Sequence, residues 1–245
     1  MKIALINEAS ESDKNQLLYD ILSEVAKKYG HTVRNYGMYS ADPLPDSQID
    51  PTDKILKPTL YRRSQDQPQL NSLHNALISG ILINTKAADL IISGCGNGQG
   101  VMVALNSYPG VICGHVVDPV DGYMFGKVNN GNAVALQLDK QFGWGAEINL
   151  KLIFEQILSI KWGSGYPEFN VESEQWEQNT LRSIKKITHH DMVYILHHLD
   201  KDFIDVALSG KHFSEYFLAD AEEGTLKDAV KEELDRIAKN NNVVS

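Results

Sequence analysis

Apolar and β-branched residues form five short runs in the first part of the chain, and segments with helical spacing lie between them. After the first run, Leu18, Leu22 and Val25 recur at intervals of four and three residues, which is the spacing of one helix face. Strands that alternate with helices are typical of a parallel sheet covered on both faces. The pattern therefore predicts an α/β fold: a doubly wound, five-stranded parallel sheet in a Rossmann-like, three-layer arrangement. The predicted strands span residues 2–6, 32–36, 90–93, 111–117 and 133–138.

Two segments depart from this alternation. Residues 38–68 contain five prolines among many polar residues, which predicts a long loop. After Gly163 the strand signals fade, and residues 170–240 show helical patterns. We therefore expect an α/β domain at residues 1–165 and a helical C-terminal extension at residues 166–245.

Charge and cysteine content narrow the classes of function. The net charge is −9, and the five arginines are scattered apart from one pair, so no basic stripe is present for nucleic acid. Two cysteines without a CxxC pattern argue against a disulfide framework and a zinc ribbon. The apolar runs are too short for a membrane span or a signal peptide. We expect a cytoplasmic protein that binds neither nucleic acid nor membranes.

The segment GCGNGQG, residues 94–100, directly follows the third predicted strand. Ligands of open α/β sheets bind beyond the carboxyl ends of the strands, where this loop lies. Its alternating glycines let backbone N–H groups converge on an anion in front of a helix. A thiolate at Cys95 would remove a proton from a carbon next to a carbonyl, while the N–H groups hold the enediolate oxygen.

Two other interpretations of this loop compete with proton transfer. The glycine spacing is neither GxGxxG nor a Walker loop, which disfavours a nucleotide-binding domain. A tight strand–helix turn around a buried, inert Cys95 is the structural alternative, since free cysteines are mostly buried. The four glycines around the cysteine favour a functional loop.

The run CGNGQGVMVALNS at residues 95–107 resembles the CGTGxGxSIAANK loop of type B ribose-5-phosphate isomerases, which are related to the galactose-6-phosphate isomerase subunits. PGV at 109–111, DP at 118–119 and NNGNAVAL at 129–136 fall where that family has PGI, DP and NDxNVLA. The resemblance covers roughly residues 1–165. It implies an aldose–ketose isomerase that acts on a sugar phosphate through a cis-enediolate, without cofactor or metal. It also implies a homodimer or homotetramer with active sites built between two subunits.

The resemblance gives roles to the matching residues. Cys95 looks like the base that moves the proton between C1 and C2 of the sugar. Asn97 stands where the family has threonine or serine and would hydrogen-bond the O1 and O2 oxygens. Asn129 matches an asparagine that touches substrate hydroxyls. The glycines that look like the anion cradle are Gly96, Gly98 and Gly100.

Departures from the family pattern concern the other end of the substrate. The family opens with a CDHAG-like segment, whereas this chain has INEAS, so that Glu8 would replace an aspartate and Ala9 a histidine. The histidine thought to open the sugar ring corresponds to Val128, and the phosphate-binding arginines have no clear counterpart. Either the substrate differs from ribose 5-phosphate, or other groups have taken over these roles. A non-catalytic sugar or sugar-phosphate binding protein on the same fold is the alternative function.

Several polar residues near the predicted strand ends complete the candidate site. Glu8 ends the first strand and is equally well read as a general acid–base group or as a solvated carboxylate. Asp118 ends the fourth strand and is expected to bind substrate. The long loop and the segment after the fifth strand contain the cations that could bind a phosphate group. The remaining candidate substrate ligands are Asn7, Lys140, Arg62 and Arg63.

The histidines do not form a metal-binding pattern. His189 and His190 lie two helical turns from His197 and His198, beyond the three- or four-residue spacing that brings ligands together on a helix. His115 lies in the fourth predicted strand and is a candidate for the missing ring-opening group, although a core histidine is the commoner role there. We therefore expect no metal site.

Overall fold

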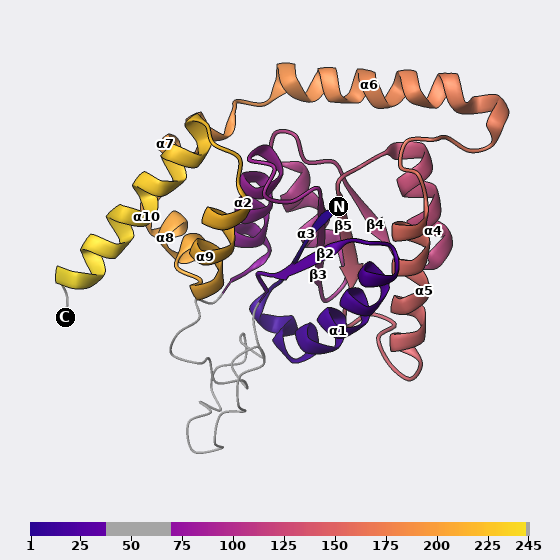
Figure 1. Ribbon diagram of the computed structural model, residues 1–245, viewed down its shortest axis with the longest axis horizontal. Coiled ribbons are helices and arrows are strands. Elements are labelled where there is room, and N and C mark those ends of the chain that lie inside the picture. The colour runs from indigo at the N-terminus through magenta and orange to yellow at the C-terminus, as the bar shows by residue number, and fades with distance from the viewer. Residues whose placement is uncertain (38–69, 244–245) are drawn as a thin grey trace.

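The computed structural model describes residues 1–37 and 70–243 of the chain (Figure 1). The predicted loop at 38–68, with Arg62 and Arg63, falls outside the described residues. Within the described ranges, no helix is both long enough and apolar enough to cross a membrane.

The centre of the molecule is a five-stranded sheet in which every strand pairing is parallel. The strand order is β2-β1-β3-β5-β4, so β1 and β3 lie side by side and Asn7 pairs with Gly94 at their carboxyl ends. The predicted doubly wound sheet is confirmed. The strands are β1 (Lys2–Asn7), β2 (Thr32–Asn35), β3 (Leu90–Cys95), β4 (Cys113–Val116) and β5 (Ala133–Gln137).

Two apolar clusters cover the two faces of this sheet. Alternate side chains of β1 separate between them: Ile3 and Leu5 belong to one cluster, and Ala4 and Ile6 to the other. Figure 1 shows the corresponding helices on either side of the strands. Helices α1 (Ser12–Lys28), α4 (Pro119–Met124) and α5 (Ala146–Ser159) cover the first face, and α2 (Ser72–Asn84) and α3 (Gln99–Asn106) cover the second.

The C-terminal part of the chain is helical, as expected. Helix α2 is buried almost all round, because two tail helices, at Met192–His198 and Lys201–Leu208, pack on the side that faces away from the sheet. Met192, Leu196, Ile204 and Phe217 join the same apolar cluster as α2. These tail helices therefore share a core with the sheet. The helices after residue 170 are α6 (Val171–Thr188), α7 (Met192–His198), α8 (Lys201–Leu208), α9 (Lys211–Asp220) and α10 (Thr225–Val243).

Helix α6 crosses the amino edge of the sheet, opposite to the end at which β3 meets the glycine loop (Figure 1). Gln178 donates a hydrogen bond to the carbonyl of Val128, and Arg182 donates one to the carbonyl of Asn130. Lys185 reaches the carbonyl of Asn106 at 2.9 Å. These three bonds tie α6 to the loops that precede β4 and β5.

Candidate active site

Cys95 is the last residue of β3 and is 6% exposed. The glycine loop turns sharply after it into α3, and Gly98 adopts the left-handed conformation with φ of +76°. Asn97 Oδ1 accepts a hydrogen bond from the Gln99 amide at 3.0 Å, and lies 3.9 Å from Cys95 Sγ. Asn97 therefore shapes the start of α3 and contacts the thiol at the same time.

The first turn of α3 supplies unpaired backbone donors next to the thiol. Within the described residues, the N–H groups of Gly100 and Val101 have no hydrogen-bond acceptor. The first N–H groups of a helix lack internal partners, and they attract negative charge. The loop can therefore hold an anionic oxygen beside Cys95, as the glycine pattern predicts.

The loop after β5 holds the glycine loop from one side. The carbonyl of Gly96 accepts hydrogen bonds from the amides of Asp139 and Lys140, both at 2.9 Å. A Cβ added to Gly96 would lie 3.0 Å from Asp139 Oδ2, so the two loops are in close contact. Lys140 is exposed and lies beside the glycine loop, where the sequence placed the nearest cation.

Glu8 follows β1 and reaches the start of α2. Its Oε2 accepts a hydrogen bond from Ser72 Oγ at 2.6 Å, and its Oε1 accepts one from Ser10 Oγ at 2.8 Å. A Cβ added to Gly100 would lie 3.9 Å from Cys95 Sγ and 4.0 Å from Ser72 Oγ. The structure thus brings Ser72, which is bonded to Glu8, and the Cys95 thiol close to the same glycine, Gly100.

Ser72 and Lys14 were missed by the sequence reasoning. Ser72 could have been found, because the helix that precedes a parallel strand starts at the carboxyl edge of the sheet. Lys14 Nζ lies 2.9 Å from Glu11 Oε2 and 2.9 Å from Asp139 Oδ1. Burial alone would lower the pKa of Lys14, but its hydrogen bonds to the two carboxylates outweigh this and raise it. Its charge is therefore already balanced inside the protein.

His115 lies in β4 behind the glycine loop. Its Nδ1 is 3.1 Å from Gln99 Nε2, while its Nε2 is buried without a partner among the described residues. A Cβ added to Gly98 would meet that Nε2 at 2.4 Å. His115 therefore contacts the loop directly.

Of the other predicted ligands, Asn7 and Asp118 lie at the carboxyl edge of the sheet but have structural partners, and Asn129 lies at the opposite edge. Asn7 is fully buried and donates to Asn15 Oδ1 at 2.9 Å. Asp118 caps α4, since its Oδ1 accepts the amides of Val120 and Asp121. Asn129 is exposed and ends the π-helical turn before β5, at the amino edge of the sheet. Within one chain, Asn129 and Cys95 are at opposite edges.

No group of three or more histidine, cysteine, aspartate or glutamate side chains that could hold a metal ion occurs in the described part of the chain. The second cysteine, Cys113, is buried in β4, where burial raises its pKa to about 12. The Cys113 thiol therefore stays protonated at neutral pH, whereas a base that removes a proton must be a thiolate.

Comparisons with known proteins agree on one family. A family model described as Ribose/Galactose Isomerase matches residues 65–160, and a model described as Ribose-5-phosphate isomerase matches residues 187–232 of the tail. No curated protein sequence matches the chain.

Solved structures match nearly the whole chain. A 4-deoxy-L-threo-5-hexosulose-uronate ketol-isomerase complexed with a tartrate is 41% identical, with a TM-score of 0.84, over 96% of this chain and 100% of that one. A ribose-5-phosphate isomerase from Vibrio parahaemolyticus is 33% identical, with a TM-score of 0.82, over 95% and 99%. A type B ribose 5-phosphate isomerase from Leishmania infantum shares the fold at 16% identity and a TM-score of 0.53, over 77% and 98%.

Proposed function

This chain belongs to the ribose/galactose isomerase family, and from that premise we propose that it is an aldose–ketose isomerase whose base is Cys95. The observation that carries the proposal is the convergence of three elements around Gly100. The Cys95 thiol, the Glu8–Ser72 pair and the free N–H groups of the α3 start lie around one glycine. This arrangement provides a base, a polar group and an anion cradle.

The proposed reaction moves one proton between neighbouring carbons. The Cys95 thiolate takes the proton from C2 of the aldose, and the C–H electron pair forms the C1–C2 double bond. Negative charge then develops on O1, where the N–H groups of Gly100 and Val101 stabilise it. A proton passes from O2 to O1 with Glu8 or Asn97 as the hydrogen-bonding group. The thiol finally returns its proton to C1, which gives the ketose and restores the thiolate.

For the substrate we propose a 4-deoxy-5-hexosulose uronate, the class named for the 41% identical relative. Such a molecule has no oxygen at C4 and a ketone at C5, so C1 has no hydroxyl at either carbon with which to close a furanose or pyranose ring. A catalyst for it has no need of a ring-opening histidine. Val128 at the position of that histidine is consistent with this substrate.

A sugar phosphate is the second candidate, because the 33% identical relative is a ribose-5-phosphate isomerase. To separate the two, the protein would be incubated with the uronate, with ribose 5-phosphate and with ribose in buffered deuterated water. NMR should show ketose formation from the uronate, with deuterium at the carbon that receives the proton. Faster turnover of ribose 5-phosphate would establish the sugar-phosphate reading. Binding without product or deuterium exchange would leave the non-catalytic alternative.

Cys95→Ala tests the base in the same assay. Loss of a positioned base typically lowers a rate about 10²–10⁴-fold. Cys113→Ala is the matched control, because it removes the protonated thiol of β4 and should leave the rate nearly unchanged. Retention of more than about a tenth of the activity by Cys95→Ala would exclude the cysteine as the base.

We further propose that the active unit contains at least two copies of the chain. Asn129 lies at the edge opposite to Cys95, so a role for it in binding substrate hydroxyls needs a second copy. Mixed subunits test this: an inactive Cys95→Ala protein and an inactive Asn129→Ala protein, refolded together, should regain part of the activity. A monomer in sedimentation that keeps full activity would overturn the shared site.

A further inference from the structure

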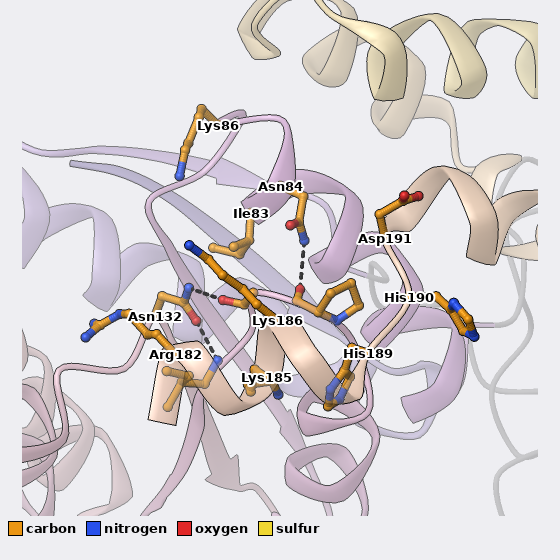
Figure 2. A pocket seen from close by; sticks show the side chains of 13 residues that line it. Ile83, Asn84, Lys86, Asn132, Arg182, Lys185, Lys186, His189, His190 and Asp191 are labelled. Atoms are coloured by element: carbon orange, nitrogen blue, oxygen red, sulfur yellow. Dashed lines mark hydrogen bonds between the residues drawn. The ribbon is translucent and has the colours of Figure 1, made fainter. Parts of the chain in front are cut away.

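A cavity of about 740 Å³ opens at the amino edge of the sheet, at the opposite end from Cys95. It lies between the end of α2, the loops that precede β4 and β5, and the last turns of α6 (Figure 2). Four lysine or arginine side chains and one carboxylate line it, and burial lowers the pKa of one of these lysines, Lys185. They are Lys86, Arg182, Lys185, Lys186 and Asp191. This concentration of cations is unexpected in a chain with a net charge of −9.

The charges of these cations are only partly balanced within the described residues. Among the described residues, no carboxylate forms an ion pair with Lys86, Arg182 or Lys186. Asp191 also forms no ion pair with them, and its Oδ1 accepts the amide of Tyr194 at the start of α7. Elsewhere in the molecule, cations such as Arg34 pair with carboxylates. Like charges around one cavity repel each other, and a bound anion would relieve that repulsion.

The side chains are arranged so that several donors remain available. Figure 2 shows the amino groups of Lys86 and Lys186 and the guanidinium of Arg182 on one side of the cavity, while His190 points away. Arg182 uses one nitrogen on the carbonyl of Asn130, and its other N–H donors have no described acceptor. Lys185 is 9% exposed and holds the carbonyl of Asn106, so it forms the inner wall.

The carboxyl ends of two helices offset part of the positive charge in the cavity. Both α2 and α6 end beside the cavity, and each helix C-terminus carries roughly −0.5 of an elementary charge. Together they balance about one of the four cations, and Asp191 balances one more. A charge of about +2 is left, which corresponds to that of one phosphate monoester.

We propose that this cavity binds the phosphate group of a small phosphorylated metabolite, at a site separate from the Cys95 loop. Arg182 provides a planar pair of donors that suits phosphate, and Lys86 and Lys186 act as point charges on the remaining oxygens. The cavity volume leaves room for the organic part of the ligand beside Ile83 and Pro109.

Isothermal titration calorimetry with inorganic phosphate and with glycerol 2-phosphate tests the site, with glycerol as the uncharged control. We expect binding that weakens with added salt. Lys86→Gln and Lys186→Gln should each raise the Kd about tenfold, as expected for charge-assisted bonds. Lys239→Gln, which removes an exposed lysine of α10 without a described partner, should not change it. Lys86 and Lys186 are exposed, so both variants should fold.

Two results would overturn this proposal. If Lys86→Gln and Lys186→Gln combined bind phosphate as well as the unchanged protein, the cavity is not the site. If phosphate competes with the isomerase substrate, and the same variants raise KM, the anion belongs to the reaction site of a neighbouring copy. Unchanged phosphate binding in Cys95→Ala, which lacks the proposed base, is expected for a separate site. This outcome does not depend on whether the isomerase assignment is right.

Discussion

Gly98 lies directly against the imidazole of His115: a Cβ added to this glycine would be 2.4 Å from Nε2 of the ring. Its φ of +76° is also in the left-handed region. Two independent constraints therefore require glycine at this point of the loop. The contact holds the backbone close to β4 and so places the start of α3 beside Cys95.

Gly98→Ala should destabilise the protein through both constraints. The left-handed backbone costs about 1–2 kcal/mol for alanine, and overpacking against His115 adds about 1–3 kcal/mol. Gly30→Ala is the matched control, since Gly30 has φ of +71° but no atom within 4 Å of an added Cβ. Urea unfolding should show a larger loss for Gly98→Ala, and the double variant Gly98→Ala/His115→Ala should recover the packing part. Equal losses at the two glycines would contradict the contact.

The contact between Ser72 and Glu8 should matter for catalysis. Ser72→Ala removes the 2.6 Å bond that fixes the Glu8 carboxylate on the side of Gly100. We expect kcat to fall about tenfold with little change in KM, and Glu8→Gln to lower it by about 10² or more. The control is Ser10→Ala, which removes the 2.8 Å bond to the other oxygen of Glu8 from an exposed serine. If Ser72→Ala and Ser10→Ala behave alike, Glu8 is a solvated carboxylate.

The fold was predictable because its signals are local. Runs of buried residues gave all five strands, with the largest error at the fourth, which starts at Cys113 and not at residue 111. Ile112 is buried next to β5, where its carbonyl accepts the amides of Asn132 and Ala133, but its own N–H bonds to the side chain of Asn132. The paired register with β5 begins only at Cys113, and a buried apolar residue just before a strand has the same sequence pattern as a residue within it.

The candidate site was predictable only where one segment contains it. Cys95, Asn97 and the glycines lie within seven residues, so their pattern could be read directly. The bond between Ser72 and Glu8 spans 64 residues, and that between Lys14 and Asp139 spans 125, so no local pattern shows them. The basic cavity at the amino edge could not be predicted from a local pattern either, because its cations come from both α6 and the turn after α2.

Stability should fall at alkaline pH in part through Cys113. Burial raises the pKa of this thiol to about 12, whereas a thiol in the unfolded chain ionises near pH 8.5. The unfolded chain therefore releases the proton first. The contribution of Cys113 is fully present below about pH 8.5 and is lost as the pH rises toward 12.

Urea unfolding between pH 7.5 and pH 10 measures this effect. The free energy of unfolding should decline more steeply in the unchanged protein than in Cys113→Ala, by up to about 1.4 kcal/mol per pH unit. The absolute stability of the variant is also lower because of the cavity it creates, so the slopes are compared. Parallel curves would mean that the thiol ionises in the folded protein as it does in the unfolded chain.

The tail and the α/β sheet should unfold together. Phe217 of α9 is completely buried in the cluster that contains α2, and His74 near the start of α2 stacks on Phe203 of α8 at 4.6 Å. Phe217→Ala should therefore destabilise the whole protein by about 3–5 kcal/mol. Phe169→Ala, at a tail residue that is 86% exposed, should change stability by less than about 0.5 kcal/mol.

Both variants are compared by urea unfolding, followed by far-ultraviolet circular dichroism and by tryptophan fluorescence. Because α2 carries Ser72 at its first turn, the loosened core of folded Phe217→Ala should also lower kcat. Two separate transitions, with Phe217→Ala affecting one of them, would show instead that the tail is an independent domain that begins near residue 166.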